Sequence, residues 1–222
     1  MKLTVFNGSP RGKGGNTKLY LDNFLNGFQA NEGNTYELAY LNHVKSQEKF
    51  VKLFEESDNV VIAFPLYCDA MPAMVKTFIE SLEPLCGRKG NPNIGFIVQS
   101  AFPEAHQSRY VERYLKKLAS RLGCNYIGTI VKGQGHGANE MPKSFKKPFA
   151  MFYQLGQIFG KTCEFDMQLS RKVAGPEKLS KLMLAIFGLL YKTPIGSKYW
   201  DDRLKANGAY EKRFDKPYAR KA

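Results

Sequence analysis

The chain has 222 residues, 43% hydrophobic and 24% charged, a composition typical of one folded domain with an extension. Met1-Lys2 leads directly into an apolar run, so we expect no signal peptide. The longest apolar stretch, residues 182–191, is about half of a membrane span, which argues against stable membrane insertion. The four cysteines are widely spaced, so paired metal motifs are excluded and a reducing, cytoplasmic location is expected.

The formal net charge of +13 is unevenly distributed, because residues 161–222 carry 14 Lys and Arg against 7 Asp and Glu. A basic segment of this kind is compatible with a nucleic-acid partner. The chain has no zinc finger, basic zipper or RNP-like aromatic motif, so we expect no such partner. A positive surface instead favours anionic cofactors and phosphorylated dinucleotides.

Apolar runs and segments of helical spacing alternate over most of the chain. The predicted strands are Leu3–Phe6, Tyr36–Leu41, Val60–Phe64, Ile94–Val98 and Tyr126–Val131. The predicted helices are Thr17–Ala30, Gln47–Ser57, Met74–Leu82, Ser108–Leu122 and a fifth around Pro148–Gly160. This alternation predicts an α/β fold in which helices cover both faces of a parallel sheet.

The segment after the first strand, FNGSPRGKGGNT, changes abruptly from apolar residues to glycines, hydroxyls and cations before a helix begins. Free N–H groups at a helix start form an anion site, and glycines let the backbone approach the anion. Ser9, Asn16 and Thr17 can donate hydrogen bonds to it, and Arg11 adds positive charge. The loop therefore predicts a phosphate site; a flexible turn that only starts the helix is the alternative.

Standard nucleotide motifs do not describe this loop. Gly8 and Gly12 enclose three residues where a triphosphate loop has four, and Lys13 is followed by glycine instead of a hydroxyl residue. The dinucleotide pattern also fails, because a pattern that starts at Gly12 places Thr17 at the third glycine position.

A second loop, residues 63–76, follows the third strand and contains two prolines that stiffen it. Leu66, Tyr67 and Met71 supply an apolar and aromatic surface that suits a flat ring system. Ligands of open parallel sheets bind beyond the carboxyl ends of the strands, where strand order reverses. The alternative is a proline-bounded loop that caps the core.

Together the two loops resemble those of the flavodoxin-like NAD(P)H-dependent FMN reductases. In that family a Gly-Ser-Pro-Arg…Asn-Thr loop holds the FMN phosphate, and a Pro-Leu-Tyr…Met-Pro…Lys loop borders the isoalloxazine ring. Segments 99–104 and 132–137 resemble the two remaining flavin-side loops. The resemblance covers about residues 1–160 and implies a doubly wound, five-stranded parallel sheet of order 2-1-3-4-5, with FMN as cofactor and NAD(P)H as electron donor.

The resemblance implies a cofactor site built from four loops. Its predicted residues are Ser9, Arg11, Asn16, Thr17, Pro65, Leu66, Tyr67, Cys68, Met71, Ser100, Ala101, Phe102, Gly135 and His136. A lone cysteine such as Cys68 is more often a small buried hydrophobe, and His136 suits an exposed turn equally well. We expect no metal: related iron–sulfur flavoproteins carry a cysteine cluster after the second strand, and residues 42–47 contain no cysteine.

The sequence pattern changes beyond Lys161, so we divide the chain into a flavodoxin-like FMN-binding domain, residues 1–162, and a basic, mainly helical extension, residues 163–222. Gly175-Pro176-Glu177 is interpreted as a helix start, Leu179–Tyr191 as an apolar helix, and Trp200–Ala222 as lacking a clear element. The run Leu182–Leu190 is too apolar to leave in water, so we expect it to pack on the core or on a second subunit, giving a homodimer. A role at a membrane surface is the less favoured alternative.

These features predict an FMN-dependent NAD(P)H oxidoreductase that passes hydride through the flavin to a small-molecule acceptor such as a quinone or flavin. The flavin carries this chemistry, so no catalytic side chain is expected. One alternative is a flavodoxin-like electron carrier, although the net charge of +13 contrasts with the acidic character of such carriers. The other is a protein that keeps the fold without the flavin.

Overall fold

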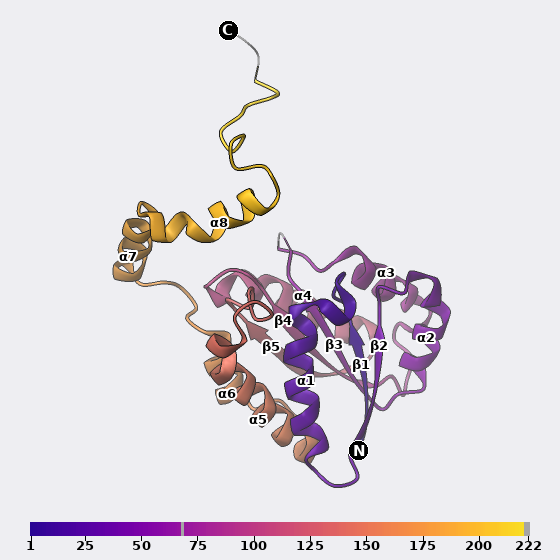
Figure 1. The fold of residues 1–222 in the computed structure, drawn as a ribbon. Helices are drawn as coiled ribbons and strands as arrows, with labels where there is room; N and C mark the ends of the chain where they lie inside the picture. Colours follow the sequence, from indigo (N-terminus) through magenta and orange to yellow (C-terminus); the bar gives the residue numbers. More distant parts are fainter. Residues whose placement is uncertain (68, 220–222) are drawn as a thin grey trace. The chain divides into compact units, whose positions relative to one another are not determined.

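The computed structural model describes residues 1–67 and 69–219, in two compact units, Met1–Lys178 and Leu179–Ala222 (Figure 1). The first unit contains a five-stranded sheet and six α-helices among its described residues. The strands are β1 (Lys2–Asn7), β2 (Thr35–Tyr40), β3 (Asn59–Pro65), β4 (Asn93–Gln99) and β5 (Asn125–Lys132). The helices are α1 (Asn16–Gln29), α2 (Gln47–Glu55), α3 (Ala73–Ser81), α4 (Arg109–Leu122), α5 (Lys146–Thr162) and α6 (Met167–Ala174).

All strand pairs of the sheet are parallel, and the strand order is β2-β1-β3-β4-β5, which confirms the predicted fold class and topology. Alternate side chains of each strand enter two separate cores. On one face Phe64, Phe96 and their neighbours pack against α2, α3 and α4. On the other face Val61, Ile97 and their neighbours pack against α1 and α5 (Figure 1). A sheet buried on both faces explains why these strands read as continuous apolar runs.

Helices α1 and α5 approach each other unusually closely. A Cβ atom added at Gly27 would lie 1.9 Å from the carbonyl oxygen of Tyr153, and one at Gly156 would lie 1.8 Å from that of Phe24. The two glycines therefore bring the helix backbones together at one crossing. Next to this crossing, the rings of Phe24 and Phe159 pack 5.6 Å apart between centroids.

Three sequence interpretations beyond residue 162 were incomplete or wrong. Helix α6 was missed; its start is capped by Asp166, whose side chain accepts a hydrogen bond of 2.6 Å from the N–H of Leu169. The second unit contains α7 (Lys181–Tyr191), capped by Ser180, and α8 (Pro194–Ala206), capped by Thr193. Helix α8 therefore occupies the first part of the segment that was assigned no element.

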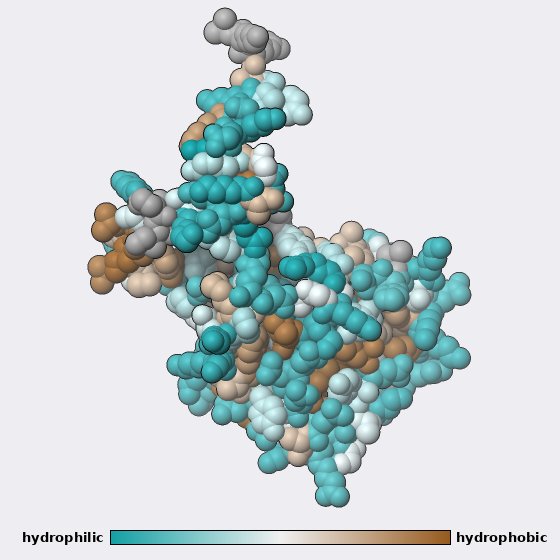
Figure 2. Space-filling model, in the orientation of Figure 1, coloured by the Kyte–Doolittle hydropathy of each residue, from teal (hydrophilic) through white to brown (hydrophobic). Residues whose placement is uncertain are grey.

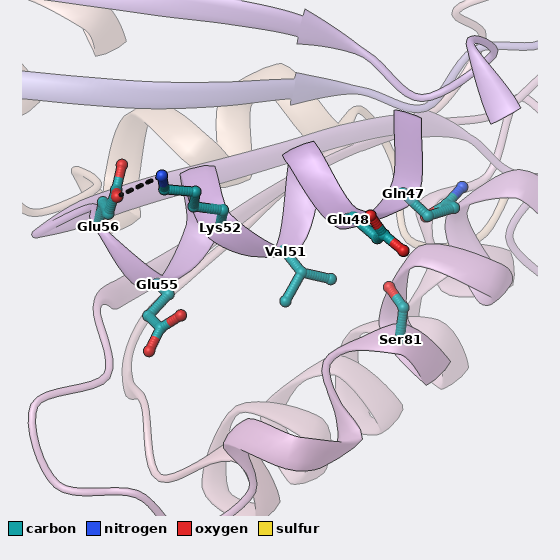
Figure 3. Close-up of a pocket in the computed structure, with 7 residues that line it drawn as sticks. All are labelled: Gln47, Glu48, Val51, Lys52, Glu55, Glu56 and Ser81. Atoms are coloured by element: carbon teal, nitrogen blue, oxygen red, sulfur yellow. Dashed lines mark ion pairs between the residues drawn. The ribbon is translucent and has the colours of Figure 1, made fainter. Parts of the chain in front are cut away.

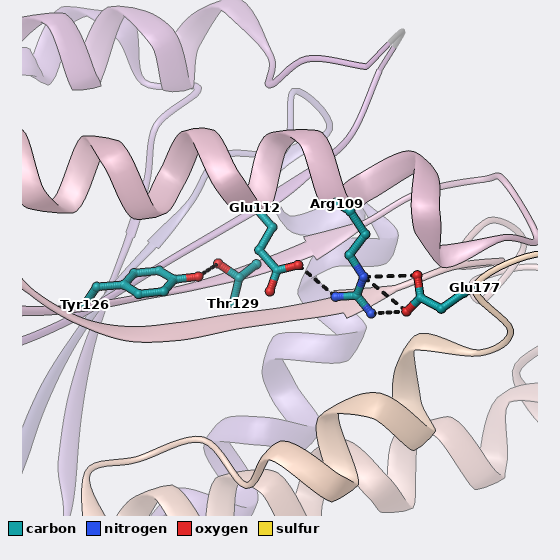
Figure 4. A network of polar contacts seen from close by, with 5 residues as sticks. All are labelled: Arg109, Glu112, Tyr126, Thr129 and Glu177. Carbon is teal, nitrogen blue, oxygen red and sulfur yellow. Dashed lines mark hydrogen bonds and ion pairs between the residues drawn. The ribbon is translucent and has the colours of Figure 1, made fainter.

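The segment Gly175-Pro176-Glu177 does not start a helix, and Glu177 instead forms an ion pair with Arg109 (Figure 4). Arg109 donates to both carboxylate oxygens of Glu177 and, over 2.8 Å, to Glu112. The hydrogen bond from Arg109 lowers the pKa of Glu177, and the same bond raises the pKa of Arg109. The pair ties the chain after α6 to the start of α4.

Among the described residues, no helix combines the length and the apolar character needed to cross a membrane. The described cysteines, Cys86, Cys124 and Cys163, are free thiols. Within the same residues no cluster of His, Cys, Asp and Glu could hold a metal ion. The division of the chain into a domain, residues 1–162, and an extension, residues 163–222, stays a prediction.

Candidate functional site

The carboxyl ends of four strands meet at one edge of the sheet, and a pocket of about 150 Å³ opens there. Because the strands are parallel, the loops after β1, β3, β4 and β5 all reach this edge. Nine of the fourteen predicted site residues line the pocket: Ser9, Arg11, Asn16, Pro65, Leu66, Tyr67, Ser100, Ala101 and His136. Long-range strand pairing thus brings together residues that are far apart in the sequence.

The loop after β1 is shaped by glycines and backbone hydrogen bonds. Gly12 has a φ of +51°, a value that favours glycine, and its N–H donates to the Ser9 carbonyl over 2.9 Å. A Cβ atom at Gly15 would lie 2.4 Å from the Ser9 hydroxyl oxygen, so glycine is needed for this hydroxyl to reach the start of α1. Ser9 itself is buried, and its N–H donates to the Asn7 side chain over 2.9 Å.

The start of α1 is open to a ligand. The residue before its first turn is Gly15, and no described side chain caps the helix there. The N–H groups of the first turn therefore point outward with the positive end of the helix dipole, as in anion sites. Thr17 is buried, and its hydroxyl accepts a hydrogen bond of 3.3 Å from Gln99, which leaves the hydroxyl proton able to donate.

Asn16 has a second role besides lining the pocket. Its side-chain oxygen accepts a 3.0 Å hydrogen bond from the N–H of Asn139, and the Asn139 amide donates to the Gly14 carbonyl over 2.9 Å. Asn139 thus fastens the loop after β5 to the loop after β1. Sequence reasoning missed Asn139, and no local signal marks it.

The loop after β3 is a tight turn. Tyr67 and Ala70 exchange backbone hydrogen bonds of 2.9 and 3.0 Å, and Asp69 adopts a φ of +66° between them. Leu66 is buried, whereas 51% of the Tyr67 surface is exposed, so an aromatic ring is available beside the pocket. Cys68 lies outside the described residues.

Met71 lies apart from this pocket. It lines a second, mainly apolar pocket of about 370 Å³ with Val111, Tyr110 and Tyr114 of α4. The structure therefore separates Met71 from the other predicted residues of its loop.

The loops after β4 and β5 are tied to each other by backbone hydrogen bonds. Ser100 donates to the Lys132 carbonyl over 2.9 Å, and its own carbonyl accepts from Gly135 over 2.6 Å. The hydroxyl of Ser100 is buried and has no partner among the described residues, which makes it a candidate ligand donor. Phe102 is exposed, and neither Phe102 nor Gly135 lines the pocket. The Gly135 carbonyl accepts a hydrogen bond from the hydroxyl of Tyr20, whose pKa is raised by burial.

Two polar residues that end buried strands lie in the predicted loop segments 99–104 and 132–137 but were not among the predicted site residues. Gln99, the last residue of β4, lines the pocket and contacts Thr17. Lys132, the last residue of β5, is buried, its ammonium donates to the Gly133 carbonyl, and burial lowers its pKa to about 8. A polar residue at the carboxyl end of an apolar strand is the signal that could have found both.

A larger groove between α2 and α3 has a different character (Figure 3). It encloses about 730 Å³, and Glu48, Glu55 and Glu56 lie along it. None of the predicted site residues reaches this groove, and its acidic lining does not suit a phosphate.

A comparison with models of known protein families agrees with the observed sheet topology. A family model described as a flavodoxin-like fold matches residues 1–82. The chain has the flavodoxin-like fold. The matched segment runs from β1 to the end of α3 and includes the two loops that resemble FMN reductases. No curated protein matches the sequence.

Several solved structures share this flavodoxin-like fold. One is an FMN-dependent NADH-azoreductase from Bacillus anthracis str. Ames Ancestor in complex with FMN, at 12% identity and a TM-score of 0.56, covering 72% of this chain and 100% of that one. Another is the NAD(P)H:quinone oxidoreductase from Methanothermobacter marburgensis, at 14% identity and a TM-score of 0.56, covering 74% and 99%. A third is an apo NADH:FMN oxidoreductase, at 11% identity and a TM-score of 0.54, covering 82% and 98%.

Proposed function

We propose that the chain binds FMN and is an NAD(P)H-dependent oxidoreductase with a small-molecule acceptor such as a quinone or a flavin. The observation that carries this proposal is the meeting of four loops at one pocket, which is lined both by residues suited to a phosphate and by an exposed aromatic residue, Tyr67. The azoreductase and quinone oxidoreductase of similar fold support the same class of reaction.

The residues at the pocket fit FMN in their chemistry. The open start of α1, the Ser9 and Thr17 hydroxyls and the cation of Arg11 suit a phosphate. The pocket volume of about 150 Å³ is smaller than that of a usual ligand pocket, so part of a bound FMN would lie outside it. We infer that this part is the ring, because donor and acceptor must both reach the ring in turn.

When bound, FMN would supply hydride transfer between a nicotinamide and the acceptor, so the protein needs no acid–base triad. The residues of the chain would bind and orient it. Ser9, Arg11, Asn16 and Thr17 would hold the phosphate, and Pro65, Leu66 and Tyr67 would border the ring. The buried hydroxyl of Ser100 would donate to a polar edge of the ligand.

A flavodoxin-like electron carrier is the alternative function. Carriers of that family tend to be acidic, whereas this chain has a net charge of +13, which favours the enzyme.

A cytoplasmic location and a homodimer remain predictions. The dimer was expected through residues 182–190, and sedimentation equilibrium measures it.

Removal of the Ser9 or Thr17 hydroxyl tests the phosphate site. Each substitution, Ser9→Ala or Thr17→Ala, should remove a charge-assisted hydrogen bond worth roughly 1.5–3 kcal/mol. FMN binding should then weaken by roughly ten- to a hundredfold, measured by fluorescence titration. Riboflavin lacks the phosphate, so its weaker binding should be nearly unchanged.

Ser120→Ala, at an exposed hydroxyl of α4, is the matched control and should leave both affinities unchanged. Equal losses for FMN and riboflavin would show that the loop is only structural. No binding of either flavin by the unsubstituted chain would refute the proposed function.

A further inference from the structure

Helix α7 is apolar on all sides and exposed. Residues 182–190 are nonpolar without interruption. The exposed fraction is 70% for both Leu182 and Leu189, and it is still 42% for Phe187 on another side of the helix. Figure 2 shows hydrophobic side chains gathered over α7. No described side chain in residues 179–219 is buried, so this unit has no core of its own to cover the helix.

The length of α7 limits how the helix could contact the hydrocarbon core of a lipid bilayer. Eleven residues form a helix about 16 Å long, whereas the hydrocarbon core of a bilayer is about 30 Å thick. The helix is therefore too short to span a membrane. It is long enough to lie in the interface with its apolar side chains below the headgroups.

The charges around α7 distinguish between possible partners. Residues 179–222 carry 10 Lys and Arg against 4 Asp and Glu, and Lys181 and Lys192 stand at the two ends of the apolar run. If two copies packed through α7, cations would meet cations whether the helices ran parallel or antiparallel. Anionic headgroups would instead complement the same charges.

Aromatic residues in the same unit fit an interface. Trp200 of α8 is 54% exposed, and its ring packs against that of Tyr199 at 5.2 Å between centroids. Trp and Tyr are enriched at membrane–water interfaces, because each combines an apolar ring with a polar group. The apolar helix, the cations that flank it and the aromatic residues are therefore all features of a segment that binds a membrane–water interface.

We propose that the unit Leu179–Ala222 docks on membrane surfaces that contain anionic lipids, with α7 lying in the interface. Docking does not depend on the flavin. One consequence rests on the proposed function: an acceptor that dissolves in the bilayer, such as an apolar quinone, would be concentrated where the chain is bound.

Vesicle binding by the full-length protein tests the proposal. Trp200 is the chain's one tryptophan, so its emission reports this unit without a label. The probes are vesicles of phosphatidylcholine alone and vesicles that also contain phosphatidylglycerol, assayed by co-sedimentation and by the Trp200 emission shift. Binding to the anionic vesicles should be at least about tenfold tighter, weaken with salt, and shift the emission to the blue.

Two sets of variants separate the contributions. The double substitution Leu182→Gln and Leu189→Gln keeps helix propensity and should weaken vesicle binding by at least about tenfold. The matched control, Met141→Gln with Met167→Gln, changes two exposed methionines of the first unit and should bind as the unsubstituted chain does. Lys181→Gln or Lys192→Gln should each weaken binding to anionic vesicles by roughly fivefold.

Absence of binding to anionic vesicles would overturn the proposal, as would unchanged binding of the Leu182 and Leu189 double variant. A dimer that this double variant converts to monomers, without vesicle binding, would identify a second copy as the partner instead. FMN affinity is measured on the same samples, so failure of docking is distinguishable from failure of the proposed function.

Discussion

Lys132 is a buried cation beside the candidate site, and its burial lowers the free energy of unfolding near neutral pH. Its ammonium is buried beside the loops that form the pocket, and it donates a hydrogen bond to the Gly133 carbonyl. Desolvation disfavours the charged form and lowers the pKa to about 8, from an ordinary value of 10.5. Near neutral pH the folded protein therefore carries a buried charge that the unfolded chain exposes to water.

The substitution Lys132→Met should raise the free energy of unfolding at pH 7, because it removes this buried charge. Between about pH 8 and 10.5 the unfolded state of the original chain binds more protons than the folded state, so its stability rises with pH. The advantage of the variant should shrink over that window by on the order of 3 kcal/mol. Urea unfolding followed by circular dichroism measures it.

Lys116→Met removes the same charge from an exposed position of α4 and corrects for the change in net charge. A constant difference between Lys132→Met and the original chain from pH 7 to pH 10 would contradict the prediction.

Among the elements, the crossing of α1 and α5 depends strongly on residue size. Gly27 and Gly156 allow backbone to approach backbone, and the aromatic side chains around them fill one of the two cores. The same helix α1 presents its open start to the pocket. Packing at the crossing thus holds the candidate phosphate site against the sheet.

We predict that Gly156→Ala lowers the free energy of unfolding by at least about 2 kcal/mol, although alanine is the better helix former. A Cβ atom 1.8 Å from the Phe24 carbonyl oxygen must push the helices apart, and such overpacking outweighs a propensity gain of about 1 kcal/mol. Gly188→Ala on α7 is the control and should not destabilise, because apart from the adjacent residues and the backbone of α7 itself no described atom lies within 4 Å of the added Cβ. Equal unfolding midpoints for the two variants would contradict this account.

At the scale of the whole molecule, the two units differ in how they are stabilised. Met1–Lys178 contains both cores and the pocket, whereas residues 179–219 contain no buried described side chain. The positive charge is also denser in the second unit. Flavin binding is therefore expected to depend on the first unit alone.

Limited trypsin digestion should cleave first within residues 179–219, because backbone without a packed core opens most readily. The large fragment should begin at Met1 and bind FMN as tightly as the full chain, measured by mass spectrometry and flavin titration. Early cleavage within the sheet, or loss of FMN affinity with loss of the second unit, would show that the units are interdependent.

The sequence by itself determined the strands, most helices and the character of the first loop, because hydrophobic periodicity and glycine placement are local properties. The segment before α1 is typical of an anion site from its residue types alone, and the parallel sheet follows from the alternation of strands and helices. The helix caps Asp166 and Thr193 were also local signals, but they stand in polar segments where periodicity is weak.

Only the tertiary structure decided which residues meet. Gln99 lines the pocket and Asn139 contacts Asn16 because strand register and loop contacts bring them there, whereas Met71 lies beside α4 in a different pocket. Likewise, Glu177 ends in an ion pair with Arg109 because α6 returns the chain to the edge of the sheet. Such contacts join residues distant in sequence, so their physical cause is packing, which no local pattern encodes.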